Sequence, residues 1–369
     1  MARVVLAMSG GVDSSVAAHL LLEEGHEVVG VFMRHGEPEV ACETGVNIQA
    51  SALPILPRAD HKQGCCSATD AEDGRRVADR LGIPFYALNL QDQFGQIMDY
   101  FVDEYVHGRT PNPCVMCNNW LKFGKLFDYA DSIDAEFVAT GHYARLVRDA
   151  GESPQLRRGI DGDKDQSYVL FGVDRERLNR MLLPVGGFTK PRIRDMAAQL
   201  DMRVAEKKDS QEICFVTSGK HAEFVQDRKG AVETSGNFVT SDGTVVGTHD
   251  GIERFTIGQR RGLGVAMGEP YFVVKIDPGT NDVVIGRHEE MNRKTLRANR
   301  ANWLVDIPQR DFACLAQIRY NSSAWPAVAR VAGDGEIEVD FDQSCTGVAP
   351  GQAVVLYDDD QVLGGGWIL

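Results

Sequence analysis

The 369-residue sequence lacks the features of a membrane, secreted or generally basic protein. It has no apolar run of about 18 residues, the length that a membrane-spanning helix needs. Its N-terminus lacks the apolar stretch and cleavage site of a secretory signal, so we expect a cytoplasmic protein without a membrane partner. Positive charge is also in deficit, with 39 Lys and Arg against 53 Asp and Glu and a formal net charge of −14. This balance argues against non-specific coating of nucleic acid.

The acidic charge is unevenly distributed along the chain. Residues 287–330 hold eight Lys and Arg against four Asp and Glu, whereas residues 331–369 hold eight Asp and Glu and no Lys or Arg. We therefore expect any nucleic acid to meet a restricted basic track that includes Arg319 and Tyr320. Binding through so few cations should weaken only modestly with salt.

The eight cysteines lack the spacing of a structural zinc site. Cys114 and Cys117 form a Cys-x-x-Cys pair, but no second Cys or His pair follows at a matching distance. In a cytosolic chain, cysteines are more often catalytic, ligating or buried than joined in structural disulfides. We expect Cys42, Cys314 and Cys345 to be core or loop residues.

Strand and helix patterns alternate in the N-terminal half. Buried strands are predicted at 4–8, 28–33, 85–88 and 137–139, and helices at about 71–81 and 94–106, with a further one opened by Pro191. Such alternation predicts βαβ units and a parallel sheet, with ligands at the carboxyl ends of the strands. Residues 34–68 interrupt the pattern, and we interpret them as a surface excursion.

Short strand patterns replace helices after Cys214. They recur at 244–246, 271–274, 283–285, 313–318, 327–331, 337–341 and 353–356, and turn residues separate them. This pattern is typical of a small β domain followed by a barrel. We place the domains at 1–212, 213–287 and 288–369.

A glycine- and serine-rich loop follows the first predicted strand. Ser9-Gly10-Gly11-Val12-Asp13-Ser14-Ser15 stands between that strand and a helix N-terminus. Its glycines, its hydroxyls and the helix dipole favour phosphate, with a tight serine-capped turn as the plainer alternative. Asp13 would repel phosphate unless a cation lay between them, which predicts Mg²⁺.

This loop is not a Walker loop, because the Gly-x-x-x-x-Gly-Lys spacing is absent. It resembles the SGGxDS loop of the PP-loop ATP pyrophosphatases, which cleave ATP between the α- and β-phosphates and adenylate an oxygen of their substrate. The loop alone does not choose among the members of that superfamily.

Two cysteines stand in distinctive surroundings. Cys117 lies in a proline-flanked segment just before a helix predicted to begin near Trp120, where a helix N-terminus would lower its thiol pKa. Cys214 follows Lys207 and Lys208, which would act in the same way if the chain folds toward them. Alternatively, Cys214 is a small buried residue between two apolar neighbours.

Six motifs occur in the order found in one family of that superfamily. The chain carries SGGVDSS, TPNPCVMCN, ATGHYAR, GDKDQSYVL, KKDSQEICFV and TIGQRRGLG. This series resembles the tRNA-specific 2-thiouridylases, from about residue 3 to the closing Gly364-Gly365-Gly366. The resemblance implies an α/β fold with a parallel-sheet PP-loop domain (adenine nucleotide α-hydrolase-like), a small central domain and a C-terminal β-barrel.

The resemblance also implies site residues. Cys117 matches the family nucleophile, and Cys214 matches the persulfide carrier that forms a transient disulfide with it. ATP would be bound by Ala7, Met8, Ser9, Gly10, Gly11, Val12, Asp13, Ser14, Met33 and Gly141. The tRNA would be contacted by Asn112, Pro113, Cys114, His142, Lys164, Asp165, Gln166, Arg319, Tyr320 and Gln352. Without the resemblance, Lys164 and Arg319 would be interpreted as solvated surface charges.

The implied activity is ATP-dependent 2-thiolation of the wobble uridine in lysine, glutamate and glutamine tRNAs, the reaction of a tRNA-uridine 2-sulfurtransferase. ATP adenylates the C2 oxygen, and sulfur from a cysteine persulfide then displaces AMP. Either the persulfide attacks directly, or Cys117 first releases hydrosulfide from Cys214. The implied partners are tRNA and a persulfide relay protein or cysteine desulfurase, and we expect a monomer.

Cys114 departs from many family members, which have an aspartate there that is proposed as an acid/base group. Cys114 could take that role as a thiolate. Alternatively, Cys114, Cys117 and Cys214 could hold an iron–sulfur cluster. Two rival functions stay open: a PP-loop ligase for a small metabolite, and a non-catalytic RNA-binding protein with a nucleotide switch.

Overall fold

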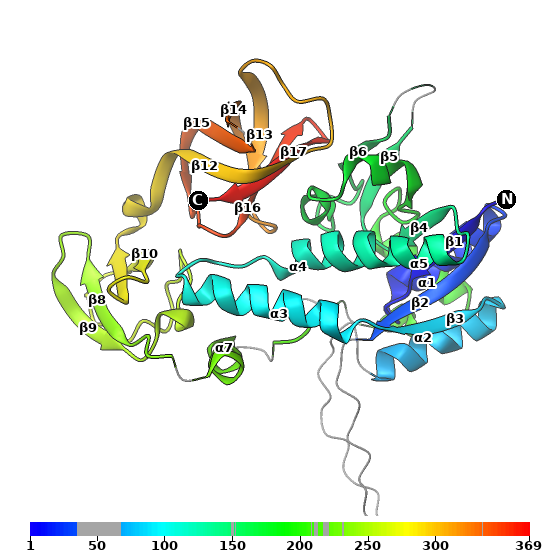
Figure 1. The fold of residues 1–369 in the computed structure, drawn as a ribbon, viewed down its shortest axis with the longest axis horizontal. Coiled ribbons are helices and arrows are strands. Elements are labelled where there is room, and N and C mark those ends of the chain that lie inside the picture. The colour runs from blue at the N-terminus through cyan, green and yellow to red at the C-terminus, as the bar shows by residue number, and fades with distance from the viewer. Residues whose placement is uncertain are drawn as a thin grey trace, which may run out of the picture.

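The computed structural model describes residues 1–34, 68–148, 151, 153–207, 209, 213–216, 221–230, 232–333 and 335–369. The predicted excursion, with Cys42, lies outside these residues except for its two ends. Three sheets organise the described chain, each in its own part of the ribbon (Figure 1). No helix within these ranges is long and apolar enough to cross a bilayer.

The first sheet is parallel, as the sequence predicts. Its strand order is β3-β2-β1-β4-β7, and the strands are β1 (Arg3–Ala7), β2 (Glu27–Arg34), β3 (Phe85–Asn89), β4 (Phe137–Thr140) and β7 (Met181–Leu182). Side chains alternate across a strand, so β1 buries Val4 and Leu6 in one core cluster and Val5 and Ala7 in another. Helices therefore cover both faces.

The two faces of this sheet carry different helices. The Val4 face packs against α1 (Val12–Glu23), α2 (Ala68–Leu81) and α6 (Lys190–Gln199). The Val5 face packs against α3 (Gln91–Val106) and α5 (Leu126–Ser132). That second core also includes Val355 and Trp367 of the C-terminal part, so the parallel sheet and the barrel share apolar packing.

A four-stranded sheet forms the middle domain, with strand order β10-β11-β8-β9. Its strands are β8 (Gly236–Thr240), β9 (Val245–His249), β10 (Phe272–Asp277) and β11 (Asp282–Gly286). The preceding helix α7 (His221–Lys229) packs against α3, whose far end reaches this domain in Figure 1.

The C-terminal strands close into a barrel. They are β12 (Asn292–Trp303), β13 (Phe312–Gln317), β14 (Trp325–Gly333), β15 (Glu336–Thr346), β16 (Ala353–Asp358) and β17 (Gln361–Ile368), and β12 pairs with β17 to complete the ring. A hairpin of the N-terminal region, β5 (Ala144–Val147) and β6 (Gln155–Arg158), extends the same sheet where Arg157 pairs with Gln361. The barrel is therefore tied to the first domain by backbone pairing as well as by packing.

The helix that carries the Cys-x-x-Cys pair begins earlier than predicted. Helix α4 (Pro113–Met116) follows the N-cap Asn112 and continues as a π-helical segment, Cys117–Lys125, into α5. Proline fits the first helical turn, which explains the start at Pro113 rather than near Trp120. Cys117 consequently lies within the helix instead of before its N-terminus, and the predicted effect on its pKa stays a prediction. Short 3-10 helices complete the fold at Ser167–Leu170, Arg175–Arg180, Arg203–Glu206, Ile252–Arg254 and His288–Met291.

Candidate active site and nucleic-acid interface

The glycine-rich loop lies where the order of the parallel sheet reverses direction. It leaves β1, and Gly141 leaves the neighbouring strand β4, so both lie at carboxyl ends beside the switch point. A Cβ atom on Gly141 would lie 2.8 Å from the amide nitrogen of Ser14, and one on Gly10 would lie 2.0 Å from the carbonyl oxygen of Asp70. Only glycine therefore fits these two close approaches, which shape the crevice.

Hydroxyl groups hold the loop in place. Ser14 Oγ accepts a hydrogen bond from the Ser9 amide at 3.3 Å, and Ser15 Oγ donates to the Gly11 carbonyl at 2.8 Å. Helix α1 begins at Val12, directly after this turn. The start of a helix supplies backbone N–H donors and positive potential, so the loop is organised to receive an anion.

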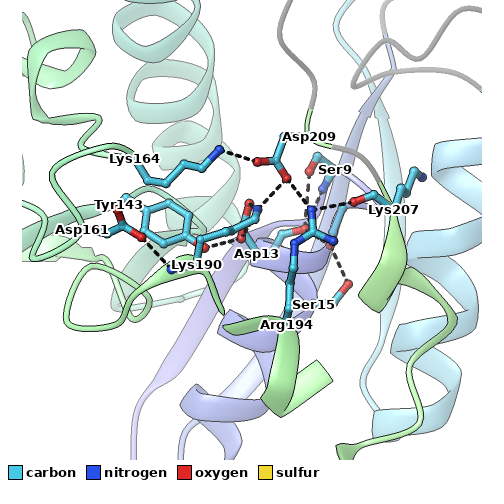
Figure 2. A network of polar contacts seen from close by, with 12 residues as sticks. Ser9, Asp13, Ser15, Tyr143, Asp161, Lys164, Lys190, Arg194, Lys207 and Asp209 are labelled. Atoms are coloured by element: carbon cyan, nitrogen blue, oxygen red, sulfur yellow. Dashed lines mark hydrogen bonds and ion pairs between the residues drawn. The ribbon is translucent and has the colours of Figure 1, made fainter. Parts of the chain in front are cut away.

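A buried lysine lies beside the loop. Lys190, at the start of α6, is 6% exposed and places its Nζ 2.8 Å from Asp13 Oδ2 and 2.8 Å from Asp209 Oδ1. The Tyr143 hydroxyl donates to Asp13 Oδ1 at 2.6 Å. Figure 2 shows these groups meeting between the loop and α6. Lys190 thus places a cation directly beside Asp13.

Further cations surround the same carboxylates. Lys164 and Arg194 bind Asp209 at 2.8 Å and 3.1 Å. Burial opposes ionisation of Asp209, but hydrogen bonds and charge from Lys164 and Lys190 outweigh it and lower its pKa to about 2. Burial and the adjacent Asp13 carboxylate raise the pKa of Tyr143, so its hydroxyl stays protonated. Asp209 is therefore ionised at neutral pH, and Tyr143 is a neutral phenol.

Lys207 reaches the opposite side of the loop. Its Nζ donates to the Gly10 carbonyl at 3.0 Å and pairs with Asp70 and Asp73 at 2.7 Å and 2.6 Å. The charge of Lys207 is therefore directed to the phosphate loop and its carboxylates, and its effect on the pKa of Cys214 stays a prediction. Lys208 lies outside the described residues.

Sequence reasoning missed Lys190, although one signal was present. Lys190 directly precedes Pro191 at a helix N-terminus, where the dipole disfavours a cation. A lysine at such a position, half a chain away from Asp13, indicates that another group compensates its charge. The contact itself depends on the fold, since α6 and α1 pack side by side on one face of the sheet.

The two cysteines singled out by the sequence lie at one core. Cys117 and Cys214 are both partly exposed and pack against the cluster that also contacts Met33. Cys114 is exposed. The described residues include no group of three His, Cys, Asp or Glu side chains arranged to hold a metal ion, so this arrangement gives no support to an iron–sulfur cluster.

The barrel cysteines differ from this pair. Cys314 and Cys345 are buried in the barrel core, as the sequence predicts. Burial raises the pKa of Cys314 to about 12 and that of Cys345 to about 11. Both thiols are therefore protonated at neutral pH and unsuited to nucleophilic chemistry.

Several positions assigned to tRNA surround the start of α4. Gln352, from the barrel, donates from Nε2 to the carbonyls of Thr110 and Pro111 at 3.1 Å and 2.9 Å. Asn112 caps the helix by accepting from the Val115 amide at 3.4 Å. The barrel thus fixes the segment that leads into Pro113 and Cys114.

An exposed aromatic ring adjoins this segment. Tyr320 is 40% exposed, and its ring lies 6.3 Å from that of Tyr168. Burial raises the pKa of Tyr320, the charges of Asp165 and Cys114 add to the rise, and a hydrogen bond with Gln166 opposes it. Tyr320, Gln166, Asp165 and Cys114 are therefore neighbours, although they come from distant parts of the chain.

Two other residues predicted to contact tRNA, Arg319 and His142, form hydrogen bonds or close contacts within the protein. Arg319 donates to the carbonyls of Gly347 at 3.0 Å and Ile257 at 2.9 Å, which joins the barrel to the middle domain. His142 is buried, with Nδ1 2.7 Å from Thr140 Oγ1, and burial followed by the Lys122 charge lowers its pKa well below the usual range. His142 is thus a neutral ring.

Two cations of the predicted basic track are paired with acids. Arg297 of β12 and Arg330 of β14 face carboxylates that come from the acidic stretch after residue 331. Arg297 pairs with Glu336 at 2.6 Å, and Arg330 pairs with Glu338 at 2.9 Å. Because antiparallel pairing places the two stretches side by side, these two charges are compensated within the sheet, and the track itself stays a prediction.

Comparisons with known proteins cover the whole chain. Family models match residues 2–218 (tRNA methyl transferase HUP domain), 222–287 (tRNA methyl transferase PRC-barrel domain) and 293–368 (aminomethyltransferase beta-barrel domain). A protein of Rhodopirellula baltica described as tRNA-specific 2-thiouridylase MnmA is 59% identical, over 100% of this chain and 96% of its own length. Proteins with the same description from Carboxydothermus hydrogenoformans and Geotalea uraniireducens are 45% and 44% identical, each over 99% of this chain and over 97% and 94% of their own lengths.

Proposed function

Because the chain belongs to the tRNA-specific 2-thiouridylase MnmA family, we propose that it replaces the C2 oxygen of the wobble uridine in tRNA by sulfur. The substrates are the lysine, glutamate and glutamine tRNAs. The observation that carries the proposal is that Cys117 and Cys214 are both partly exposed and pack against one hydrophobic core, which also contacts Met33 near the carboxyl end of β2. Two accessible thiols on the core of a domain that carries a phosphate loop suit sulfur transfer to an activated base.

ATP binds at the loop between β1 and α1. The loop amides and hydroxyls receive the phosphates, and Met33 and Gly141 flank the nucleotide at the ends of β2 and β4. Lys190 is the cation that the pyrophosphate meets, because it is buried between Asp13 and Asp209 at the same edge. Fixed charges in a partly dry crevice stabilise a leaving group better than solvated ones do.

The chemistry proceeds in two displacements. The C2 oxygen attacks the α-phosphorus of ATP, pyrophosphate leaves, and an adenylated base remains. A persulfide on Cys214 then supplies sulfur, and the C2–O bond breaks to release AMP. Cys117 attacks the Cys214 sulfur, either before or after the new C–S bond forms, and the resulting disulfide is reduced by an external thiol.

The proposal also covers the metal ion, the sulfur donor, the oligomeric state and location of the chain, and the role of Cys114. Mg²⁺ neutralises phosphate charge when bound, and Asp13 would hold it, once Lys190 releases one carboxylate oxygen. The sulfur donor is a persulfide relay protein or a cysteine desulfurase. The chain acts as a monomer in the cytoplasm. Cys114 contributes acid/base chemistry at the target base, beside Tyr320.

Thiolation of unmodified tRNA tests the proposal directly. The assay contains the enzyme, ATP, Mg²⁺, a persulfide donor and one of the three tRNAs, and it measures 2-thiouridine and AMP. Cys117→Ser and Cys214→Ser should each abolish 2-thiouridine, whereas the buried Cys314→Ser should retain it if the protein folds. Unchanged product from both active-site variants would contradict the mechanism and favour a non-catalytic RNA-binding role. AMP formation with a small metabolite in place of tRNA would favour the metabolite ligase.

A further inference from the structure

The loop Thr256–Gly264 of the middle domain is held in one conformation by its own hydrogen bonds. Gln259 Oε1 accepts from the Thr256 amide at 3.1 Å, and Gln259 Nε2 donates to the Arg261 carbonyl at 3.0 Å. The Gly258 amide donates to Val273 O at 2.8 Å, and the Val273 amide donates to Gln259 O at 3.0 Å. The part of the loop before the arginines is thereby tied to β10.

Two arginines project from this fixed loop. Ile257 and Leu263 are buried in the core of the middle domain, while Arg260 and Arg261 between them are exposed. Gly262 and Gly264 have φ of +77° and +71°, a region that other residues rarely adopt, and this allows the chain to turn back to Leu263.

The charges of Arg260 and Arg261 distinguish them from Arg287 of the same domain and from two arginines of the barrel. Within the described part of the chain, neither forms an ion pair, whereas Arg287, Arg297 and Arg330 each face a carboxylate. A guanidinium that is already paired must exchange one partner for another when it binds an anion. Arg260 and Arg261 bear no such cost, and the planar guanidinium matches phosphate geometry.

The adjacent residues Arg319 and Tyr320 connect this loop to the candidate base-binding groups. Arg319 donates to Ile257 O at the base of the loop, and a Cβ atom on Gly258 would lie 3.6 Å from its guanidinium. The next residue, Tyr320, adjoins Gln166 and Tyr168. The exposed cations therefore stand on the same domain junction as the groups assigned to the target base.

We propose that Arg260 and Arg261 bind the phosphate backbone of the tRNA next to the base being modified, and that Arg319 is a positioning residue for their loop. This inference rests on the proposed function, because it takes tRNA as the ligand. An RNA backbone fits better than an acidic protein, since the loop is joined through Arg319 to the junction where the base must enter. Among the described residues, no ion pair compensates the positive charge that these two arginines supply.

The test removes both charges without disturbing the loop. Arg260→Gln/Arg261→Gln should weaken tRNA binding about tenfold at about 0.1 M salt, and should reduce the slope of log affinity against log salt by about 2, one for each phosphate contact. With a small-molecule persulfide as the sulfur source, thiolation should fall at low tRNA concentration and recover as tRNA approaches saturation. Arg297→Gln/Arg330→Gln is the matched control, because it removes the same charge from ion-paired positions.

Three results would overturn the inference. The first is unchanged affinity and slope in the Arg260/Arg261 variant. The second is an equal loss in the control, which would indicate a general charge effect. The third is normal tRNA binding with thiolation that falls only when a relay protein donates sulfur, which would assign the loop to that protein. Failure of the proposed function is distinguishable, because the unaltered enzyme would then form no 2-thiouridine whatever the binding data show.

Discussion

The phosphate-loop crevice and the outer barrel sheet both contain many paired charges, but the pairs differ in burial. At the crevice, Lys190 is nearly inaccessible and lies between Asp13 and Asp209. On the barrel, Arg297 is 57% exposed and reaches across strands to Glu336. Solvent and salt screen the second kind of pair far more than the first.

This difference in burial indicates that the ion pairs of the two regions have different roles. Buried charges are costly unless they are compensated, so a protein retains them where a charged ligand or a reaction needs them. Exposed cross-strand pairs contribute little energy and chiefly set strand neighbours. The crevice is therefore the region where removal of one charge should alter chemistry, and the barrel is where it should not.

The largest effect is expected from Lys190→Met. The substitution leaves Asp13 and Asp209 without their shared cation, and loss of one partner of a buried pair costs about 3 kcal/mol of unfolding free energy. Loss of the charge that faces pyrophosphate should slow AMP formation about 100-fold. Urea unfolding and a single-turnover AMP assay measure the two effects.

The control for this variant is Lys275→Met. Lys275 pairs with Asp277 at 3.0 Å, but both side chains are exposed. Its loss should change the unfolding free energy by less than about 1 kcal/mol and leave AMP formation intact. If Lys190→Met and Lys275→Met changed the unfolding free energy and AMP formation equally, burial would not determine how much an ion pair contributes.

Local patterns in the sequence were sufficient for much of the first region. Alternating and continuous apolar runs predicted β1, β2, β3 and β4, and the glycine-rich turn after β1 predicted the anion site. These features depend on neighbours in sequence, so they can be recognised without the fold. The contact of Lys190 with Asp13 depends on the packing of α6 against α1, which no local pattern encodes.

The barrel was harder to predict for a related reason. Strand β12 was missed because Asn292–Trp303 is rich in Arg and Asn, and among its residues only Leu296 and Ala298 are buried in the core. The basic track was predicted from charges counted along the chain, whereas register places Arg297 opposite Glu338 of β15 and Arg330 opposite the same residue from β14. Sequence spacing does not report cross-strand neighbours until the pairing is known.

An intermediate effect is expected from pH, and it should be confined to the crevice. The pKa of Asp209 is lowered to about 2, so its ionised form favours folding at pH values above its ordinary pKa, near 4. This contribution is lost as pH falls from about 4 towards 2. In urea unfolding, the stability difference between the native chain and Asp209→Asn should therefore shrink over that range.

Asp277→Asn is the exposed counterpart in the same experiment. Its hydrogen bond with Lys275 also lowers the pKa of Asp277, but the carboxylate lies in solvent. The stability difference for this variant should be small at every pH. A pH dependence as steep as that of Asp209→Asn would mean that burial does not control these pairs.

The smallest effect is expected from Arg297→Gln on the barrel. Arg297 pairs with Glu336 and Glu338 at the surface, so its loss should lower the unfolding free energy by at most about 1 kcal/mol. High salt should abolish that difference, because it screens exposed pairs, while the Lys190→Met difference persists. Urea unfolding at low and high salt measures both. If the loss of unfolding free energy in Arg297→Gln persisted at high salt, the exposed barrel pairs would stabilise the fold in the same way as the buried crevice pairs.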